Sequence, residues 1–299
     1  MPARDWVGVE MLPEDAVRKS ASVAAIMVTA AALAACAAGA TEPPGASSAA
    51  TLPPTDGVFD YQLGEVYERV DRGAGPVDID VVVRDSTAEP LEGAYNVCYV
   101  NGFQTQPGDA AFWLERDDLL LRDATGGLLV DPEWPDEYIL DPSTAAQRDG
   151  IVDVLGPVID GCAADGFDAV EIDNLDTWTR FDRVDRGGAH VLATAYVERA
   201  HAAGLAIAQK NAAEITRIAH DELGFDFAVA EECGVWDECG AYTDVYGDHV
   251  LQIEYPDSLD EGTATFGDVC RLPDRAPLTI LRDRDLLGPS SADYVYRSC

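Results

Sequence analysis

Carboxylate side chains gather at the ends of two apolar segments in the second half of the sequence. The first segment covers residues 167–176 and contains Asp173 near its end. The second covers residues 225–233 and contains the adjacent acids Glu231 and Glu232. Their apolar residues favour a buried strand, whereas the acids favour a turn. Such a strand end is where a parallel α/β protein places its catalytic groups, although the same pattern is typical of a polar loop that caps a helix.

Two carboxyl groups that face each other across a cleft are suited to glycoside hydrolysis. One of them protonates the leaving oxygen, and the other acts as the nucleophile or activates water. Crowded negative charges raise the pKa of one carboxyl, which suits that group to donating a proton. We therefore predict that Asp173 and Glu231 are the catalytic pair. Clustered acids also bind calcium, but the sequence contains no EF-hand spacing, so we expect neither a metal ion nor a cofactor.

Strands and helices that alternate along the chain must position these acids. Apolar residues at helical spacing predict helices after Ser143 or Thr144 and over 189–203 and 212–223. The predicted strands are 59–63, 77–83, 95–100, 138–141, 167–172, 205–209, 225–230, 249–253 and 277–281. This alternation favours an α/β fold, a single (β/α)8 TIM barrel. A doubly wound open sheet is the alternative, and the lack of a Gly-x-Gly-x-x-Gly motif argues against it.

In a barrel, the residues that follow the parallel strands all reach the same mouth. Polar and aromatic residues at these positions are therefore predicted to bind the substrate or to hold the catalytic acids. They are Asp80, Asn101, Asn174, Asp176, Trp178, Lys210, Asn211, Glu232 and Tyr255.

Aromatic residues near the strand ends offer flat faces on which sugar rings could stack. They are Tyr61, Tyr99, Phe103, Trp113, Trp134, Trp178, Trp236 and Tyr255. Trp178 and Trp236 are the strongest candidates, because each closely follows a candidate catalytic acid. For any single one of these aromatic residues, packing on the barrel rim is an equally good interpretation.

The formal net charge of −35 excludes nucleic acid as an expected partner, because phosphates would be repelled. A cationic ligand is compatible with this charge, and so is a general effect on solubility. The chain is long enough for one large domain with a sizeable core, and we expect a monomer.

The N-terminus predicts an address outside the cytoplasm. A short basic region at Arg18 and Lys19 precedes the uncharged apolar run 20–35, which is too short to span a bilayer and ends in small residues. The motif Leu33-Ala-Ala-Cys36 resembles a bacterial lipobox, so residues 1–36 are predicted to be a lipoprotein signal peptide with lipidation at Cys36. Residues 37–56 read as a flexible linker, and 57–299 as the catalytic domain. The expected location is the outer face of the cytoplasmic membrane, attached only through the lipid, or the extracellular medium.

The other six cysteines are an even number, which suggests disulfides outside the cytoplasm. Six cysteines allow fifteen pairings, and the sequence does not choose among them. Our hypothesis pairs neighbours along the chain: Cys98 with Cys162, Cys233 with Cys239, and Cys270 with Cys299. A zinc site is the alternative, and it lacks a Cys-x-x-Cys pair or a nearby His.

Several short motifs resemble glycoside hydrolase family 114, the endo-α-1,4-polygalactosaminidase family, over residues 57–299. They are Phe59-Asp-Tyr-Gln-Leu-Gly64, Cys98-Tyr-Val-Asn101, Gly166-Phe-Asp-Ala-Val-Glu-Ile-Asp-Asn-Leu-Asp176, Gln209-Lys-Asn211 and Ala230-Glu-Glu-Cys233. The resemblance implies a (β/α)8 barrel that cleaves α-1,4-linked galactosamine polymers with an Asp and a Glu. The aspartate falls on Asp173. The glutamate falls on Glu231, with Glu232 as the alternative.

These observations predict a glycoside hydrolase that acts on a polysaccharide substrate, which would be cationic if it is deacetylated. One alternative is a lipoprotein that binds carbohydrate without cleaving it. Another is a hydrolase of a different polysaccharide, because one fold hosts many specificities. The stereochemical outcome depends on the gap between the two carboxyl groups, about 5–5.5 Å for retention and about 6.5–9.5 Å for inversion.

Overall fold

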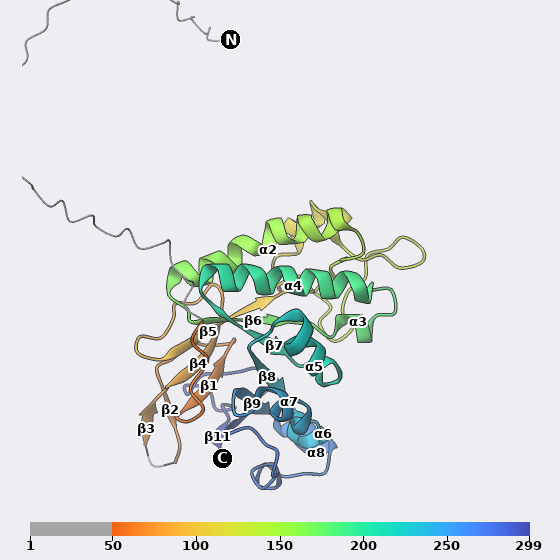
Figure 1. Cartoon of the computed structure of the whole chain (residues 1–299). Coiled ribbons are helices and arrows are strands. Elements are labelled where there is room, and N and C mark those ends of the chain that lie inside the picture. Colours follow the sequence, from red (N-terminus) through yellow and green to blue (C-terminus); the bar gives the residue numbers. More distant parts are fainter. Residues whose placement is uncertain (1–49, 74) are drawn as a thin grey trace, which may run out of the picture. The chain divides into compact units, whose positions relative to one another are not determined.

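The protein is an α/β fold built on one curled, mostly parallel sheet (Figure 1). The computed structural model describes residues 50–73 and 75–299. Within them the sheet has nine strands in the order β1-β4-β5-β6-β7-β8-β9-β10-β11. Each pair of neighbours from β1 to β10 is parallel, and β11 runs antiparallel to β10. The strands are β1 (Phe59–Gln62), β4 (Val81–Asp85), β5 (Tyr95–Asn101), β6 (Ala169–Asp173), β7 (Ala206–Lys210), β8 (Phe227–Glu231), β9 (Val250–Glu254), β10 (Leu278–Arg282) and β11 (Tyr296–Ser298).

The predicted α/β fold with parallel strands in chain order is confirmed, but a complete (β/α)8 barrel is not. Among the described residues no backbone ladder joins β10 to β1, although the two strands lie side by side. The first two strand connections also lack helices. The small hairpin of β2 (Arg69–Asp71) and β3 (Pro76–Asp78) fills the connection between β1 and β4. The segment 86–94 between β4 and β5 is too short for a crossover helix.

Helices connect the strands from β5 to β10. They are α1 (Ala110–Leu114), α2 (Ala145–Asp165), α3 (Thr177–Arg180), α4 (Arg186–Ala203), α5 (Thr216–Ile218), α6 (Cys233–Trp236), α7 (Cys239–Tyr246), α8 (Pro256–Glu261) and α9 (Phe266–Val269), with the short turns η1 (Asp117–Leu119), η2 (Ala213–Ile215) and η3 (Ala219–Leu223). The two long helices, α2 and α4, lie side by side along one side of the sheet (Figure 1). Thr144 starts α2 with a reciprocal capping box to Gln147, as the sequence suggested, and Gly166 ends it in the left-handed conformation.

Three of the predicted elements are wrong in detail. The strand predicted over 77–83 is broken into β3 and β4, because its first part pairs with β2 in the hairpin. The segment 138–141 makes only isolated bridges to other loops and does not join the sheet. The helix predicted over 212–223 is a succession of short turns that begins after two residues of positive φ, Asn211 and Ala212.

The two faces of the sheet bury two different sets of side chains. Side chains that face the helices, such as Val170 and Ile172, pack in one apolar cluster with α2 and α4. Side chains that point to the concave interior, such as Ala169, Ala208 and Val229, form a second cluster. Because strand residues alternate, the interior-facing register continues to the last residue of β6, β7 and β8. This register directs the acids and the lysine at the strand ends into the mouth of the curled sheet.

The three predicted disulfides are confirmed: Cys98–Cys162, Cys233–Cys239 and Cys270–Cys299. The first fastens β5 to α2 and the last fastens the C-terminus to the segment after α9.

The predicted signal peptide and its lipidation site Cys36 lie outside the described residues. Residues 50–56, predicted as the end of a linker, lie against the folded part: Tyr95 Oη donates to the carbonyl of Thr51, and Pro53 is buried. Residues 50–56 therefore pack with the folded domain, although the sequence predicted them as part of the linker. No helix in the described part of the chain is both long and apolar enough to cross a membrane.

Candidate active site

Three adjacent parallel strands end in the residues that define the site, and each is followed by a left-handed residue. Asp173 ends β6, Lys210 ends β7 and Glu231 ends β8. The residues immediately after them, Asn174, Asn211 and Glu232, have φ of 61°, 49° and 62°. A positive φ costs on the order of 1–2 kcal/mol for most residues with a side chain, and less for asparagine, so Glu232 is the costliest of the three. The same left-handed turn at three neighbouring strand ends bends the chain away sharply and leaves the last strand side chain facing the mouth.

These strand ends surround a cavity of about 590 Å³. Eight of the predicted site residues line it: Asp173, Asn174, Asp176, Lys210, Asn211, Glu231, Glu232 and Tyr255. Strands β1, β4 and β5 contribute Tyr61, Asp85 and Tyr99, and helix α3 contributes Arg180. Loops complete the wall with Gln106, Glu133, Trp134, Glu137 and Arg284.

The ammonium group of Lys210 is the centre of the site. Its side chain is 3% exposed. Nζ lies 3.3 Å from Asp173 Oδ1 and 3.1 Å from Glu231 Oε2, so it bridges the two candidate catalytic acids. It also lies 3.3 Å from Glu171 Oε1 and donates to Tyr61 Oη at 3.1 Å. Burial alone would lower the pKa of this lysine, but the negative groups around it outweigh burial and hold its pKa well above the usual value.

Each catalytic candidate is also fixed by hydrogen bonds from its neighbours. Asp173 Oδ2 accepts from Tyr99 Oη at 2.6 Å, and its Oδ1 accepts from the backbone N–H of Asn174 at 2.8 Å. Glu231 Oε1 accepts from Tyr255 Oη at 2.5 Å, and its Oε2 accepts from Asn211 Nδ2 at 3.1 Å. Asn211 Oδ1 accepts in turn from the backbone N–H of Glu231 at 2.8 Å. Both acids are thereby preorganised, with all of these donors directed at carboxylate oxygens.

The pKa of Glu231 differs from what crowding of acids alone would predict. Burial raises this pKa, but the charge of Lys210 and the hydrogen bonds from Tyr255 and Asn211 outweigh burial, so the net shift is downward. Glu231 is therefore ionised at neutral pH. The sequence-based expectation of a raised pKa within the pair did not include a lysine between the two acids.

Two further acids have pKa values raised to about 7, mainly through burial. Glu171 lies on the interior face of β6, two residues before Asp173, and is completely buried. Its Oε1 accepts from Tyr61 Oη at 2.8 Å, while its Oε2 has no hydrogen-bond partner among the described residues. Glu137 lies in the loop between β5 and α2, lines the cavity and accepts from Asn101 Nδ2 at 3.0 Å.

Two arginines neutralise acids at the rim of the cavity. Arg180 contacts Asp131 at 2.5 Å and Asp176 at 3.2 Å. Arg284 contacts Glu232 at 2.5 Å and also lies over the ring of Tyr255, 4.0 Å from its centre. Asp176 and Glu232 therefore stabilise the wall through ion pairs with arginines. In this they differ from Asp173 and Glu231, which contact Lys210.

Three predicted site residues do not line the cavity. Asp80 precedes β4, accepts from the backbone N–H of Val58 and lies at the amino-terminal ends of the strands, opposite the mouth. This placement follows from the break between β3 and β4. Trp178 packs against the apolar cluster beside α4, edge to face with His190, because α3 turns it away from the opening. Asn101 is buried behind the wall, where it links Asn174 to Glu137.

The sequence reasoning also missed several residues of the site. Glu171 was detectable from the period of two, since it shares the strand face of Asp173. Arg180, Arg284 and Glu137 come from loops and short helices whose paths the sequence does not reveal. Trp134 was only one of several aromatic candidates, yet it lines the cavity and is 54% exposed, whereas Trp236 is 48% exposed and does not line it.

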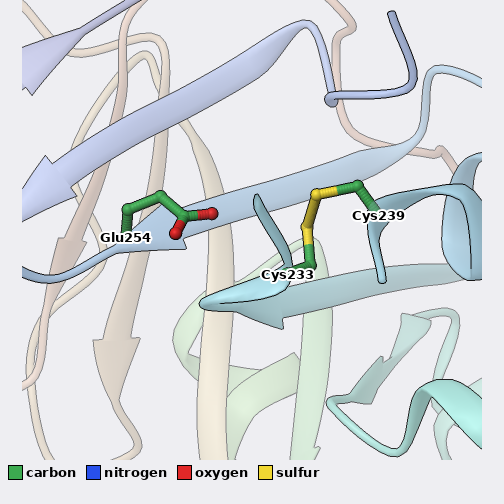
Figure 2. Close-up of side chains that lie close together, drawn as sticks. All are labelled: Cys233, Cys239 and Glu254. Atoms are coloured by element: carbon green, nitrogen blue, oxygen red, sulfur yellow. A yellow bond between two sulfur atoms is a disulfide. The ribbon is translucent and has the colours of Figure 1, made fainter. Parts of the chain in front are cut away.

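In the described part of the chain, one group of possible metal ligands lies close together: Cys233, Cys239 and Glu254 (Figure 2). The two sulfur atoms are bonded to each other, so they offer no thiolates for a metal ion. The Glu254 carboxylate accepts from the backbone N–H of Gly234 and from Gln252 Nε2. These contacts identify Glu254 as a buried structural acid beside the disulfide.

A curled parallel sheet with an Asp and a Glu on nearby strand ends, both facing one cavity, is suited to glycoside hydrolysis by two carboxyl groups. The model of glycoside-hydrolase family GH114 matches residues 39–299, and the chain belongs to this family. The sequence-based identification of the family and of a glycoside hydrolase is thus confirmed.

Solved structures share the fold. The structure of Aspergillus fumigatus Ega3 in complex with galactosamine is similar with a TM-score of 0.61 at 20% identity, covering 85% of this chain and 100% of that one. The glycoside hydrolase domain of PelA from Pseudomonas aeruginosa is similar with a TM-score of 0.51 at 13% identity, covering 81% of this chain and 98% of that one. A comparison with curated protein sequences finds none that matches.

Proposed function

We propose that the protein hydrolyses α-1,4-linked, galactosamine-containing polysaccharide, with Asp173 and Glu231 as the two catalytic carboxyl groups. The observation that carries this proposal is the single ammonium group of Lys210, which contacts both acids within 3.3 Å. It holds the two carboxyl groups at a fixed separation and at a fixed balance of charge. The similarity to Ega3, whose crystals contain galactosamine, supports the choice of sugar.

The shared lysine also bears on the stereochemical outcome. The two oxygens that contact Nζ cannot be farther apart than their two contact distances combined. For these two oxygens, that limit lies between the separation of about 5–5.5 Å typical of retaining enzymes and the 6.5–9.5 Å typical of inverting ones. We propose retention, in which one carboxylate attacks the anomeric carbon while the other protonates the leaving oxygen. The second group then takes a proton from the water that releases the product.

The charge of the cavity wall favours a polymer with free amino groups. The lining contains the acids Asp85, Glu133, Glu137, Asp173, Asp176, Glu231, Glu232 and Asp285, against the cations Arg180, Lys210 and Arg284. All three cations are in ion pairs. The excess of carboxylates would attract an ammonium sugar and repel an anionic one. Acetylation removes the ammonium charge, so the partially or fully deacetylated polymer is the proposed substrate.

Trp134 replaces Trp178 as the proposed sugar platform. It belongs to a turn that Asp131 anchors: Asp131 is buried, accepts from the Glu133 backbone N–H, and pairs with Arg180. Its exposed ring at the cavity wall thus belongs to a turn that these contacts of Asp131 fasten to the wall. A preorganised aromatic face lowers the entropic cost of binding a flexible polymer.

Two structural expectations remain part of the proposal. We propose that β10 and β1 close the sheet through side chains, because Arg282, buried between them, contacts Asp60 Oδ1 at 2.5 Å and the carbonyl of Tyr61. We also propose a monomer anchored outside the cytoplasmic membrane through lipidated Cys36.

The test is to incubate the full-length protein with partially deacetylated α-1,4-galactosaminogalactan and to follow reducing ends. We expect release by the wild type and a loss of at least a thousandfold in kcat for Asp173→Asn and for Glu231→Gln, with their melting temperatures close to that of the wild type. Proton NMR of the first product would show the retained anomer. Release that survives both substitutions would reject the pair, and failure of the wild type to cleave this polymer would reject the substrate.

A further inference from the structure

Glu137 is the most deeply buried acid of the cavity wall. It lines the cavity with only 7% of its surface exposed, whereas the other acids there are partly buried or exposed. The three cations of the wall form ion pairs with other acids, and within the described residues none of them pairs with Glu137. Its Oε2 accepts from Asn101 Nδ2 at 3.0 Å, while its Oε1 accepts a hydrogen bond from no described residue. One oxygen of this buried acid is therefore available to a ligand.

An acid without a cation at this depth is unfavourable for folding. Burial raises the pKa of Glu137 to about 7 against the lowering effect of the hydrogen bond from Asn101. The charged groups that face it are Asp131 in the same loop, Asp173 at the end of β6 and Arg180 at the end of α3. A glutamine of the same shape would accept the same hydrogen bond without the cost of burying a charge. A ligand therefore explains this acid better than folding does.

Two hydrogen bonds place Glu137 between the proposed sugar platform and a catalytic acid. Its backbone N–H donates to the carbonyl of Trp134 at 2.9 Å, which fixes both residues on one turn. Its partner Asn101 accepts from Asn174 Nδ2 at 2.9 Å, and Asn174 directly follows Asp173. Glu137 therefore borders the part of the cavity in which a sugar unit would lie against the platform.

We propose that Glu137 is a specificity-determining residue whose free carboxylate oxygen binds the ammonium group of a galactosamine unit. The inference deepens the proposed function and rests on it for the presence of a galactosamine polymer in this cavity. An ammonium group offers three donors, and hydrogen bonds between charged partners are roughly twice as strong as those between neutral ones. Because N-acetylation removes the charge, Glu137 selects for the deacetylated unit.

The other acids of the wall are less suited to this role. Four of them already contact a cation. Both oxygens of Asp85 accept hydrogen bonds from side chains of the neighbouring loops. Glu133 and Asp285 are exposed, where water and salt weaken an ion pair. Burial and a free oxygen are therefore combined in Glu137.

The test is the binding of monosaccharides, which contain no glycosidic bond to cleave, to the full-length wild type and to Glu137→Gln at pH 7.5. At this pH most of the free carboxyl group is ionised. In NMR titrations we expect the substitution to weaken galactosamine binding about tenfold and to change the binding of galactose and N-acetylgalactosamine less than twofold. An equal loss for all three sugars, or no binding of galactosamine by the wild type, would overturn the inference.

Asp136→Asn is the matched control. Asp136 is the preceding residue in the same turn, but it is exposed and does not line the cavity. The substitution removes the same negative charge from the turn, and galactosamine affinity should stay within twofold of the wild type. An equal loss in this control would attribute the effect to the net charge of the turn and overturn the specific role of Glu137.

The difference between the wild type and Glu137→Gln should disappear at low pH. At pH 5.5 Glu137 is protonated in the free protein, so galactosamine must displace that proton before the ion pair can form. The wild type should then bind galactosamine with an affinity within about twofold of the variant. A tenfold difference that persists at pH 5.5 would assign the effect to shape or to neutral hydrogen bonding and overturn the inference.

Monosaccharide binding does not depend on cleavage, so this inference and the proposed function can fail separately. Selective galactosamine binding without release of reducing ends would reject the proposed activity and still support the role of Glu137. Where the deacetylated polymer is cleaved, the loss in Glu137→Gln should appear in KM, about tenfold, rather than in kcat. A loss confined to kcat would identify Glu137 as a proton donor in the reaction and overturn its assignment to substrate recognition.

Discussion

Replacement of Lys210 by methionine is the perturbation whose result the structure predicts most sharply. The side chain is nearly isosteric, but the substitution removes the cation that contacts Glu171, Asp173 and Glu231 at 3.1–3.3 Å. At an effective dielectric constant of about 20, each such contact corresponds to roughly 5 kcal/mol of attraction, offset by the cost of burying the charges. Removing one partner of a buried ion pair typically destabilises a protein by about 3–5 kcal/mol. We expect the melting temperature at pH 8 to fall by about 10 °C.

The effect should depend on pH, with a defined sign. Without the ammonium, the buried carboxyl groups bind protons more tightly in the folded state than in the unfolded chain. The stability of the variant must then decrease as pH rises, since unfolding releases those protons and a higher pH favours the state that binds fewer of them. The difference in melting temperature from the wild type should therefore be larger at pH 8 than at pH 5. In Glu231 specifically, loss of the lysine removes the main cause that lowers its pKa.

The assay is calorimetry of the full-length protein at the two pH values, with Arg199→Met as the matched control. Arg199 also pairs with a carboxylate, Asp160, but both side chains are substantially exposed. Exposed pairs contribute about 0–1 kcal/mol, so this control should melt within about 3 °C of the wild type. If Lys210→Met were as stable as the control at pH 8, the reasoning that Lys210 neutralises the three acids would be refuted.

Two other substitutions give direct tests. Trp134→Ala should raise KM for the polymer about tenfold with little change in kcat. Trp236 is similarly exposed but lies outside the cavity, so Trp236→Ala should leave both constants unchanged. Equal effects of the two substitutions would reject Trp134 as the sugar platform. Replacing Cys270 and Cys299 together by Ser removes a disulfide that closes a loop with a sequence separation of 29. We expect the free energy of unfolding, measured by chemical denaturation, to fall by about 3–4 kcal/mol while KM is unchanged. An unchanged denaturation midpoint would contradict this.

The sequence predicted the parallel core of the fold well, and the reason is periodicity. The strands that end at Asp173, Lys210 and Glu231 are short apolar runs followed by polar turn residues, and the long helix before the first of them begins at the cap Thr144. Local preferences and the final structure agree in these elements, so the pattern is sufficient there. Over 77–83 they disagree, because pairing within the hairpin interrupts a run of strand-forming residues. Asp80 was placed at the wrong end of the sheet for this reason.

The loop residues of the site follow from long-range contacts that no local pattern encodes. Glu137 reaches the cavity because its loop is tied to Asn101, while Arg284 reaches it from beyond β10 to pair with Glu232. Trp178 shows the converse, since proximity in sequence to Asp173 did not place it at the cavity. Its ring instead packs against the core beside α4. Sequence separation from a catalytic acid is therefore a poor guide to participation when a tight turn follows the strand.

Several destabilising features occur together on the adjacent strands that end at Asp173, Lys210 and Glu231. They are the left-handed turns, of which the one at Glu232 costs most, a buried lysine, and a buried acid with one unpaired oxygen among the described residues. The apolar interior below and the helices outside hold these strands in place, so the strain cannot relax by local rearrangement. Glu171→Gln removes one of these elements, and its melting temperature should exceed that of the wild type by a margin that grows as pH rises from about 4.5 to 7. In that interval the folded wild type keeps a proton on residue 171 that the unfolded chain has already released, so rising pH favours unfolding of the wild type but not of the variant. A variant that gains stability while its kcat/KM falls would show that this buried acid is retained for catalysis rather than for folding.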